Sequence, residues 1–421
     1  MSVENTQAVF RRAMTAFGLP DGGKVAVAVS GGADSTALCL LTRRFVAENG
    51  GEMIALIVDH GLRPRSAEQA FLTKERLSAR GIPCRLLKWE GEKPARGIEQ
   101  AAREARYRLL SEACRKENCS VLLLGHHRQD QAETFLIRRA RGSGAVGLAG
   151  MSAVRKTDFG RILRPLLSVP PADLREYDRF YGMPWVEDET NLSADFDRGR
   201  LRQTLTAEQI EDAFRQSLLF GEKRRAIEKA AADFVIKQVD VSDRGYLLFS
   251  KRAFQSLDPE TALFCLGDFL RFVADRPYAP RSESLKALYE KTQTLSFGGE
   301  TLGGCRIAAC AKDGILIWRE ENDLPEPEKI AGRTAFRWDR FSFRLDFAPS
   351  DSLFVAPLKN ANAGKKPFPK RTFSVLPALF DNEGLFIAPH LGYKRTKAVC
   401  RVAFTPRTSL CKAVQWASPV M

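Results

Sequence analysis

The chain has 421 residues, of which 44% are hydrophobic and 28% are charged. This composition is typical of globular proteins and excludes disordered and fibrous classes, and the length exceeds the usual size of one hydrophobic core. Lysine and arginine outnumber aspartate and glutamate by 65 to 51, which gives a formal net charge of +14. The excess favours nucleic acid as a partner, although a basic protein without such a partner has the same charge.

The nine cysteines are scattered, without a C-x-x-C pair, and the chain has only four histidines. This pattern predicts reduced thiols and argues against a structural zinc or iron–sulfur site. The first residues are polar, and no window holds about 18 uncharged apolar residues. We therefore expect a cytoplasmic protein that has no membrane partner.

From residue 24 onward, short β-branched runs alternate with amphipathic segments. Strands are expected at 24–29, 53–59, 83–89 and 121–125, each followed by a helix. Four such alternations predict an α/β fold, a doubly wound parallel sheet with helices on both faces. Sheets of this kind bind ligands at the carboxyl ends of their strands.

The pattern changes in the second half of the chain. Helices are predicted over 207–238, 258–275 and 282–293, followed by strands at 305–311 and 315–320. Residues 323–329 have the composition of a linker, and the rest is rich in β-formers. The expected domains are an α/β catalytic domain (1–209), a mainly helical substrate-binding domain (210–322) and a small β-containing C-terminal domain (330–421).

The strongest local signal follows the first strand directly and precedes a helix. It consists of Ser30, Gly31, Gly32, Ala33, Asp34 and Ser35. Two glycines let the main chain approach an anion, and N–H groups at a helix N-terminus, with two serine hydroxyls beside them, suit phosphate. The lysine of a Walker A loop is absent. The alternative is an ordinary strand-to-helix turn capped by Ser or Asp.

Polar side chains also follow the second and fourth strands, at the same edge of the predicted sheet. Asp59 ends the second strand and suits a cation, whereas His126, Asp130 and Glu133 follow the fourth. Asp130 and Glu133 are three residues apart and share a helix face, so they can hold an ammonium group or assist its deprotonation. The alternatives are a core or capping histidine and a capping box made by the two acids.

Taken together, these motifs resemble known families. The 30–35 loop resembles the pyrophosphate loop of the N-type ATP pyrophosphatase (PP-loop) superfamily. With the motifs at 58–64, 97–107, 125–134, 141–144, 164–166, 187–191 and 198–202, about the first 205 residues resemble the tRNA(Ile)-lysidine synthetase family.

The resemblance implies an ATP-dependent ligase that forms a carbon–nitrogen bond. Such an enzyme adenylates the C2 oxygen of the wobble cytidine in tRNA(Ile) with a CAU anticodon, and L-lysine then displaces AMP. The product, lysidine, changes codon reading from AUG to AUA. The implied cofactors are ATP and Mg²⁺. A related PP-loop enzyme, a tRNA thiolase, is the alternative, but it would need cysteine pairs that this sequence lacks.

The resemblance also implies residue roles. Residues 30–35 would bind ATP, with Asp34 serving Mg²⁺ and the adenine lying near Ala28 and Val58. Catalysis would involve Asp34, Arg106, His126, Asp130 and Glu133, and the lysine or a cation would meet Asp59, Asp130 and Glu133. One departure is Gln129, where the family commonly has an acid, so the metal would rely on Asp34, Asp130 and water.

Clustered arginines flank the expected site and suit an RNA backbone, which attracts such clusters by counterion release. They are Arg138, Arg139, Arg141, Arg198, Arg200 and Arg202. The alternative is a solvated surface. Under the resemblance, domains 210–322 and 330–421 would also bind tRNA. The sequence leaves the oligomeric state open, a homodimer included.

Overall fold

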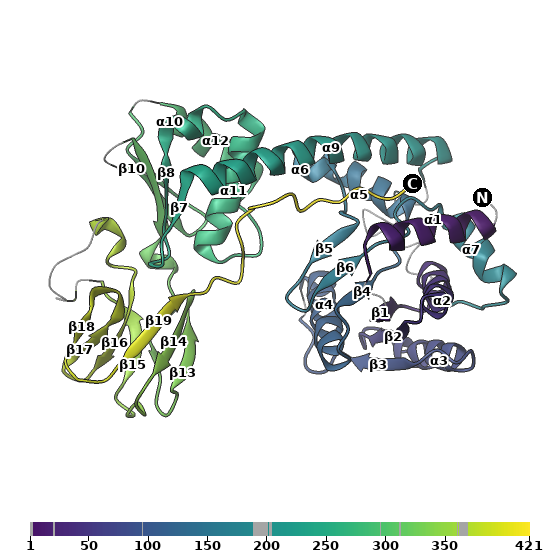
Figure 1. Ribbon diagram of the computed structural model, residues 1–421, viewed down its shortest axis with the longest axis horizontal. Helices are drawn as coiled ribbons and strands as arrows, with labels where there is room; N and C mark the ends of the chain where they lie inside the picture. The colour runs from purple at the N-terminus through teal and green to yellow at the C-terminus, as the bar shows by residue number, and fades with distance from the viewer. Residues whose placement is uncertain are drawn as a thin grey trace. The chain divides into compact units, whose positions relative to one another are not determined.

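The computed structural model describes residues 3–19, 22–94, 96–187, 201, 204–294, 296–310, 313–359, 361 and 369–421. The chain divides into two compact units, residues 1–226 with 415–421 and residues 227–414. The long helix α9 (Ala207–Gln238) begins in the first unit and ends in the second (Figure 1). Among the described helices, none combines the length and apolar character needed to cross a membrane.

The first unit is built on a sheet with the strand order β3-β2-β1-β4-β6-β5. Its strands are β1 (Lys24–Val29), β2 (Glu52–Asp59), β3 (Cys84–Lys88), β4 (Val121–Leu123), β5 (Val154–Lys156) and β6 (Arg161–Leu163). All neighbours are parallel except β5, which runs antiparallel to β6. The predicted parallel sheet is confirmed. The short strands β5 and β6 were not predicted, because three residues show no periodicity.

Side chains alternate between the two faces of this sheet and enter two separate cores. Val25, Val27 and Val29 point into a core shared with α1 (Val3–Ala16), α2 (Ala33–Glu48), α3 (Ser66–Ser78) and α7 (Pro171–Phe180). Ala26 and Leu122 point into a second core, which α4 (Ile98–Lys116) covers. Helices therefore lie on both faces, as predicted for a doubly wound fold (Figure 1).

The strand order places β1 beside β4 at the centre of the sheet. The chain leaves β1 into α2 and leaves β4 into α5 (Arg128–Ala140), which is followed by the short α6 (Ala145–Leu148). In open parallel sheets, the point where the strand order reverses leaves a crevice at the carboxyl ends, and ligands bind there. The 30–35 loop lies at this point.

The second unit begins with an antiparallel sheet that packs against helices. Its order is β7 (Val239–Val241), β8 (Leu247–Ser250), β11 (Gly314–Arg319), β10 (Cys305–Cys310) and β9 (Gly299–Leu302). The helices are α10 (Lys251–Gln255), α11 (Pro259–Ala274) and α12 (Ser282–Gln293). The predicted helices and the β10–β11 hairpin are present, and three further short strands extend the hairpin into a sheet.

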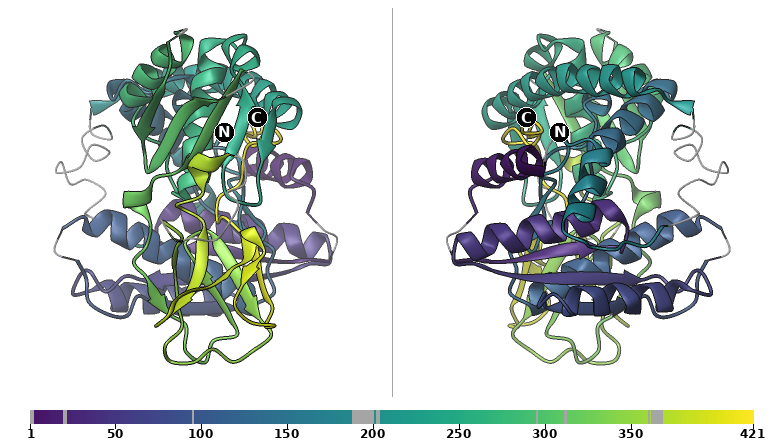
Figure 2. Two further views of the ribbon diagram at one scale, coloured as in Figure 1. Left: turned by 90° about the vertical axis from the view of Figure 1, so that its left-hand side faces the viewer. Right: turned by 90° about the vertical axis from the view of Figure 1, so that its right-hand side faces the viewer.

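The C-terminal segment forms two more antiparallel sheets, coloured light green to yellow in Figure 2. One contains β12 (Glu328–Lys329), β15 (Phe354–Pro357), β16 (Pro377–Asp381), β17 (Gly384–Ala388) and β18 (Tyr393–Lys394). The other contains β13 (Ala335–Trp338), β14 (Phe341–Leu345) and β19 (Cys400–Phe404). The predicted β character of this segment is confirmed. The fully buried Arg340 donates hydrogen bonds to the carbonyls of Gly245 (2.9 Å) and Val273 (2.6 Å), which ties the β13–β14 hairpin to the rest of the unit.

Residues 415–421 belong to the first unit, although they follow the last residue of the second unit in sequence. The Ala153 N–H donates to the Ala417 carbonyl (2.9 Å), and the Trp416 ring lies on α9 where Gly221 leaves room for it. A Cβ atom at Gly221 would overlap the indole ring.

We predict that Gly221→Ala destabilises the protein by about 1–3 kcal/mol, the usual cost of overpacking, because the indole must move. Alanine otherwise favours a helix over glycine, so a loss of stability isolates the steric clash. Thermal unfolding measures the effect. Gly298→Ala is the control, since no atom lies within 4 Å of the added Cβ. A melting temperature at or above wild type for Gly221→Ala would contradict the packing.

Candidate active site

The loop from Ser30 to Ser35 joins β1 to α2 in a conformation that requires glycine. Gly32 is the N-cap of α2, with φ −74° and ψ 160°. Gly31 has φ +92°, in the region that favours glycine, and a Cβ atom there would overlap the Thr73 hydroxyl. At the N-terminus of α2, the main chain of the loop therefore carries no side chains at Gly31 and Gly32. The N–H groups there can bind an anion.

The two serine hydroxyls differ in what they are able to bind. Ser35 is buried, and its hydroxyl donates to the Gly32 carbonyl (2.9 Å) and accepts from the Ser30 N–H (3.1 Å). Ser30 Oγ lies 3.2 Å from Ser35 Oγ at the exposed end of this chain of bonds. Ser35 thus holds the loop in shape, whereas Ser30 is exposed. Binding of phosphate by Ser30 and the main-chain N–H groups stays a prediction.

Asp34 and Asp130 come from separate elements, and both carboxylates approach the same nitrogen of His127. His127 Nε2 lies 3.4 Å from Asp34 Oδ2 and 3.5 Å from Asp130 Oδ2. His127 also caps α5, since its ring accepts from the Asp130 N–H (3.4 Å) while Asp130 Oδ2 accepts from the His127 N–H (3.1 Å). Asp130 therefore takes part in the helix cap and also lies near Asp34, so the two interpretations of this residue do not exclude one another. His127 was missed as a site residue, although its position beside His126 at a strand end was the available signal.

A cavity of about 420 Å³ opens at the carboxyl ends of β1, β2 and β4, a volume within the range of small-molecule sites. It brings together many residues expected from the sequence: Ala28, Ser30, Gly32, Asp34, Ser35, Val58, Arg106, His126 and Asp130. The lining residues that were not predicted as site residues include four with polar or charged rings or guanidinium groups: His60, Arg63, Arg103 and Tyr107.

The His60 ring lies on the edge of this cavity. It packs edge-on against Trp89, with ring centroids 6.3 Å apart. Burial, followed by the positive charge of Arg106, lowers the pKa of His60 below its usual value near 6.5. The imidazole is therefore neutral at pH 7 and adds a polar group without charge to the wall.

Two predicted acids do not line the cavity. Asp59 is buried, and its Oδ1 accepts hydrogen bonds from the Gly61 N–H (2.9 Å) and the Ser66 hydroxyl, so it shapes the turn into α3. Glu133 is fully buried in α5, one turn beyond Asp130. The roles expected for both in binding lysine or a cation stay predictions.

The flanking arginines take different positions. Arg138 donates to the carbonyls of Gly147 (2.6 Å) and Gly150 (3.1 Å), which ties α5 to the turn after it. Arg139 lies over the Phe135 ring at 5.4 Å, and both Arg139 and Arg141 are exposed. Arg198, Arg200 and Arg202 lie outside the described residues. Contact of these six arginines with RNA stays a prediction.

The residues fit a magnesium ion that arrives with a nucleotide. The Asp34 carboxylate is 37% exposed and lines the cavity next to the anion loop. Mg²⁺ is usually held by one or two carboxylates together with substrate phosphates and water. Within the part of the chain that the structure describes, no group of three or more His, Cys, Asp or Glu forms a cage for a metal. Asp34 would therefore share the ion with phosphate oxygens.

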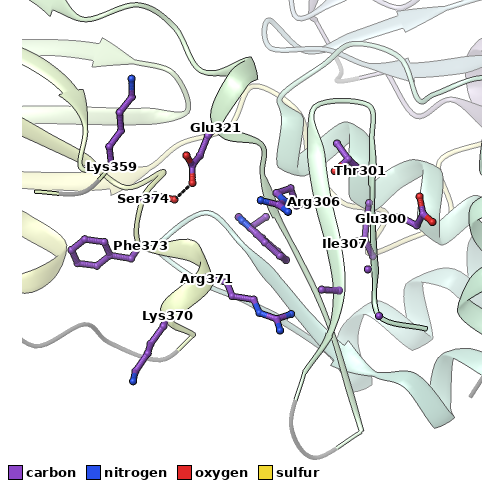
Figure 3. Close-up of a pocket in the computed structure, with 14 residues that line it drawn as sticks. Glu300, Thr301, Arg306, Ile307, Glu321, Lys359, Lys370, Arg371, Phe373 and Ser374 are labelled. Carbon is purple, nitrogen blue, oxygen red and sulfur yellow. Dashed lines mark hydrogen bonds between the residues drawn. The ribbon is translucent and has the colours of Figure 1, made fainter. Parts of the chain in front are cut away.

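A larger cavity, about 800 Å³, lies in the second unit (Figure 3). Its basic lining residues are Arg306, Lys359, Lys370 and Arg371. The Arg371 side chain extends toward β10 and donates to the Ala309 carbonyl (3.3 Å), and Ser374 bonds to Glu321 across the cavity wall. This cavity is lined by basic side chains, whereas the 30–35 loop and the N-terminus of α2 line the cavity at the sheet edge of the first unit.

The comparison with known proteins agrees with this geometry. Residues 5–209 match the PP-loop domain family. The fold and the site thus define an ATP-binding enzyme of the PP-loop class.

Relatives then specify the family. The tRNA(Ile)-lysidine synthase of Wolbachia pipientis wMel is 33% identical over 367 residues, which cover 85% of this chain and 84% of the relative. That of Hyphomonas neptunium is 37% identical over 331 residues, covering 76% and 88%. A Bradyrhizobium sp. protein of the same name is 46% identical over 193 residues, covering 45% and 54%. The chain belongs to the tRNA(Ile)-lysidine synthase family.

We predict that Asp34→Asn and Asp130→Asn each lower ATP-dependent pyrophosphate release by about 100-fold or more, the loss typical of removing one preorganised electrostatic group. Asparagine keeps the size of the side chain and its ability to cap a helix, so α2 and α5 remain intact. The measurement is pyrophosphate release with lysine and tRNA, beside a tRNA-binding assay that should change little. Asp158→Asn, an exposed acid elsewhere in the unit, is the control. Near-normal release by both variants would remove these carboxylates from the site.

Proposed function

We propose that this enzyme uses ATP to adenylate the C2 oxygen of the wobble cytidine in a tRNA(Ile) with a CAU anticodon, after which L-lysine displaces AMP. The observation that carries the proposal is that the 30–35 loop, Asp34, His126 and Asp130 share the wall of one nucleotide-sized cavity. Membership in the tRNA(Ile)-lysidine synthase family supports the choice of substrate.

The order of steps follows from leaving-group chemistry. Oxide and hydroxide leave carbon poorly, so the cytosine C2 oxygen first bonds to the α-phosphorus of ATP and pyrophosphate departs. An amine of lysine then bonds to C2, the C2–O bond breaks, AMP leaves and the nitrogen loses a proton. The product base is lysidine, which pairs with A, so the tRNA reads AUA instead of AUG.

Each part of the cavity has a role in these reaction steps. The main-chain N–H groups of the loop, with the positive end of the α2 dipole behind them, would hold the outer phosphates. The adenine would lie against Ala28 and Val58, at the ends of β1 and β2. Mg²⁺ held by Asp34 would neutralise charge on the phosphates.

In this proposal, Asp130 would bind the amine of lysine. It lines the cavity, and its carboxylate is buried at the helix cap formed by His127. A buried carboxylate favours an ammonium partner, and an amine attacks only after it loses its proton. Asp130 would therefore bind the lysine ammonium and orient it toward C2 as the proton leaves.

A tRNA thiolase is the rival among PP-loop enzymes, and the cysteines argue against it. No cysteine lines the nucleotide cavity. Burial raises the pKa of the Cys114 and Cys400 thiols to about 12, and it raises the pKa of Cys84 and Cys119 as well. Since the thiolate is the reactive form, these groups are unsuited to sulfur transfer.

The decisive test supplies the protein with ATP, Mg²⁺, lysine and total tRNA, then digests the tRNA to nucleosides for mass analysis. We expect cytidine to gain the mass of lysine less water, with AMP and pyrophosphate formed in equal amounts. Omission of lysine is the control. Sulfur in a nucleoside would instead support the rival enzyme, and tRNA without any change of mass would sink the proposal.

We further propose that the basic cavity of the second unit binds the tRNA backbone, in keeping with tRNA-binding roles for the segments 210–322 and 330–421. Its arginines approach from two sides, Arg306 from β10 and Arg371 from the 3-10 helix η3 (Lys370–Thr372) (Figure 3). Phosphate contacts of this kind add affinity without reading sequence.

Accordingly, we predict that Arg306→Ala combined with Arg371→Ala weakens tRNA binding and lowers the slope of log K against log salt by about 1.8, or about 0.9 for each lost duplex phosphate contact. A filter-binding titration at several salt concentrations gives both quantities. Arg281→Ala, an exposed arginine of the same unit, serves as the control. Unchanged affinity and slope in the double variant would place the RNA elsewhere.

A further inference from the structure

Four arginines surround Tyr107 in the first unit. The guanidinium carbons of Arg103, Arg155 and Arg106 lie 5.1, 5.5 and 5.8 Å from the centre of its ring. The fourth, Arg164, is 6% exposed and interacts with the phenol group. Tyr107 and two of the arginines belong to α4, whereas Arg155 lies on β5 and Arg164 follows β6. Separate elements thus converge on one aromatic ring.

The charges in this cluster act on one another. Burial alone would raise the pKa of Tyr107, yet the positive charges of Arg103, Arg164, Arg106 and Arg155 lower it overall. Burial lowers the pKa of Arg164, and the charges of Arg155 and Arg103 lower it further. The guanidinium groups therefore repel one another, and the arrangement costs free energy unless an anion offsets it.

Arg103, Arg155 and Arg164 have no ion pair with a carboxylate among the described residues. Other arginines of the same helix do: Arg108 lies 3.8 Å from Glu112, and Arg115 pairs with Asp158. The contrast is within one helix, so it reflects the position of the cluster rather than a general shortage of acids.

The exposure of the arginine side chains in this cluster indicates which anion they bind. Arg103 lines the nucleotide cavity but is exposed, and Arg155 is exposed beside it. The outer phosphates of ATP already have the main-chain donors of the 30–35 loop. An anion at the two exposed arginines therefore comes from solvent at the mouth of the cavity. When an RNA base enters such a cavity, its phosphodiesters stay at the mouth.

We propose that Arg103 and Arg155, held against the ring of Tyr107, clamp a phosphodiester of the RNA strand at the mouth of the nucleotide cavity. The clamp rests on the proposed function, since it positions the strand that carries the target cytidine. Tyr107 is a positioning residue whose ring supports both guanidinium groups through cation–π contact. Arg164 is buried and interacts electrostatically with the phenol group of Tyr107.

The test is the double variant Arg103→Ala, Arg155→Ala, in which both side chains removed are exposed and the core is untouched. We expect the KM for tRNA to rise about 10-fold or more, while kcat at saturating tRNA and the KM values for ATP and lysine stay within about twofold, because phosphate contacts position the strand without reacting. The slope of log K against log salt should fall by about 1.4, or about 0.7 for each lost single-strand contact. Arg108→Ala, exposed on the same helix, is the matched control.

Two variants of Tyr107 test the positioning role. Tyr107→Leu removes the ring and should raise the KM for tRNA nearly as much as the double variant, whereas Tyr107→Phe keeps the ring and should have a smaller effect. A merely structural role would instead lower the melting temperature and leave the salt dependence of tRNA binding at its wild-type slope. That result, or a double variant with unchanged KM and slope, would overturn the clamp. An equal rise in the KM for ATP would overturn it too, because the cluster would then serve the nucleotide.

Equilibrium binding of tRNA without ATP or lysine separates this inference from the proposed function. If the wild-type protein makes no lysidine but the double variant loses tRNA affinity and salt sensitivity, the clamp stands and the proposed activity fails. If lysidine forms and the double variant binds tRNA like wild type, the activity stands and the clamp fails.

Discussion

The close approach of neighbouring atoms to two glycines, at the carboxyl ends of β1 and β4, is the constraint on which the site depends. Gly31 has φ +92° and faces the Thr73 hydroxyl, and a Cβ atom at Gly125 would lie 3.1 Å from the Asp34 carbonyl, so a side chain at either position would crowd its neighbour. Without this approach the loop could not turn directly into α2, and Asp34 would not reach His127. The accessible N–H groups of the loop and the approach of Asp34 to His127 therefore depend on two positions that carry no side chain.

The fold could be predicted from the sequence wherever apolar residues follow a clear periodic pattern. The apolar runs of β1 and β2 are buried on both faces, and such runs identify a parallel sheet. Strands of two to four residues, such as β5, β6 and β7, carry too few residues for any pattern and are fixed by pairing with their neighbours. The sheet of the second unit was therefore recognised only in the β10–β11 hairpin, whose strands have six residues each.

Site residues that belong to one sequence motif could be predicted. Site residues that the fold brings together from separate elements were harder to predict. Residues 30–35 and 126–130 each follow a strand, so their place at the sheet edge could be inferred. Asp59 has the same position, but its carboxylate is bonded to the Gly61 N–H and the Ser66 hydroxyl, and local turn geometry of this kind is hard to foresee. The Tyr107 cluster joins α4 to residues 155 and 164, and no spacing in the sequence indicates that contact.

Two kinds of anion recognition lie side by side in the first unit, and the proposed reaction gives a reason for both. The 30–35 loop offers neutral N–H groups at a helix terminus, which suit a phosphate held in a shaped pocket. Arg103 and Arg155 offer exposed charge, which suits a flexible backbone in solvent. In the proposed reaction, pyrophosphate departs after adenylation while the RNA stays bound for attack by the amine. Because different groups would hold the two anions, the loss of one would leave the other in place, and the activated base would remain in the cavity until lysine reaches it.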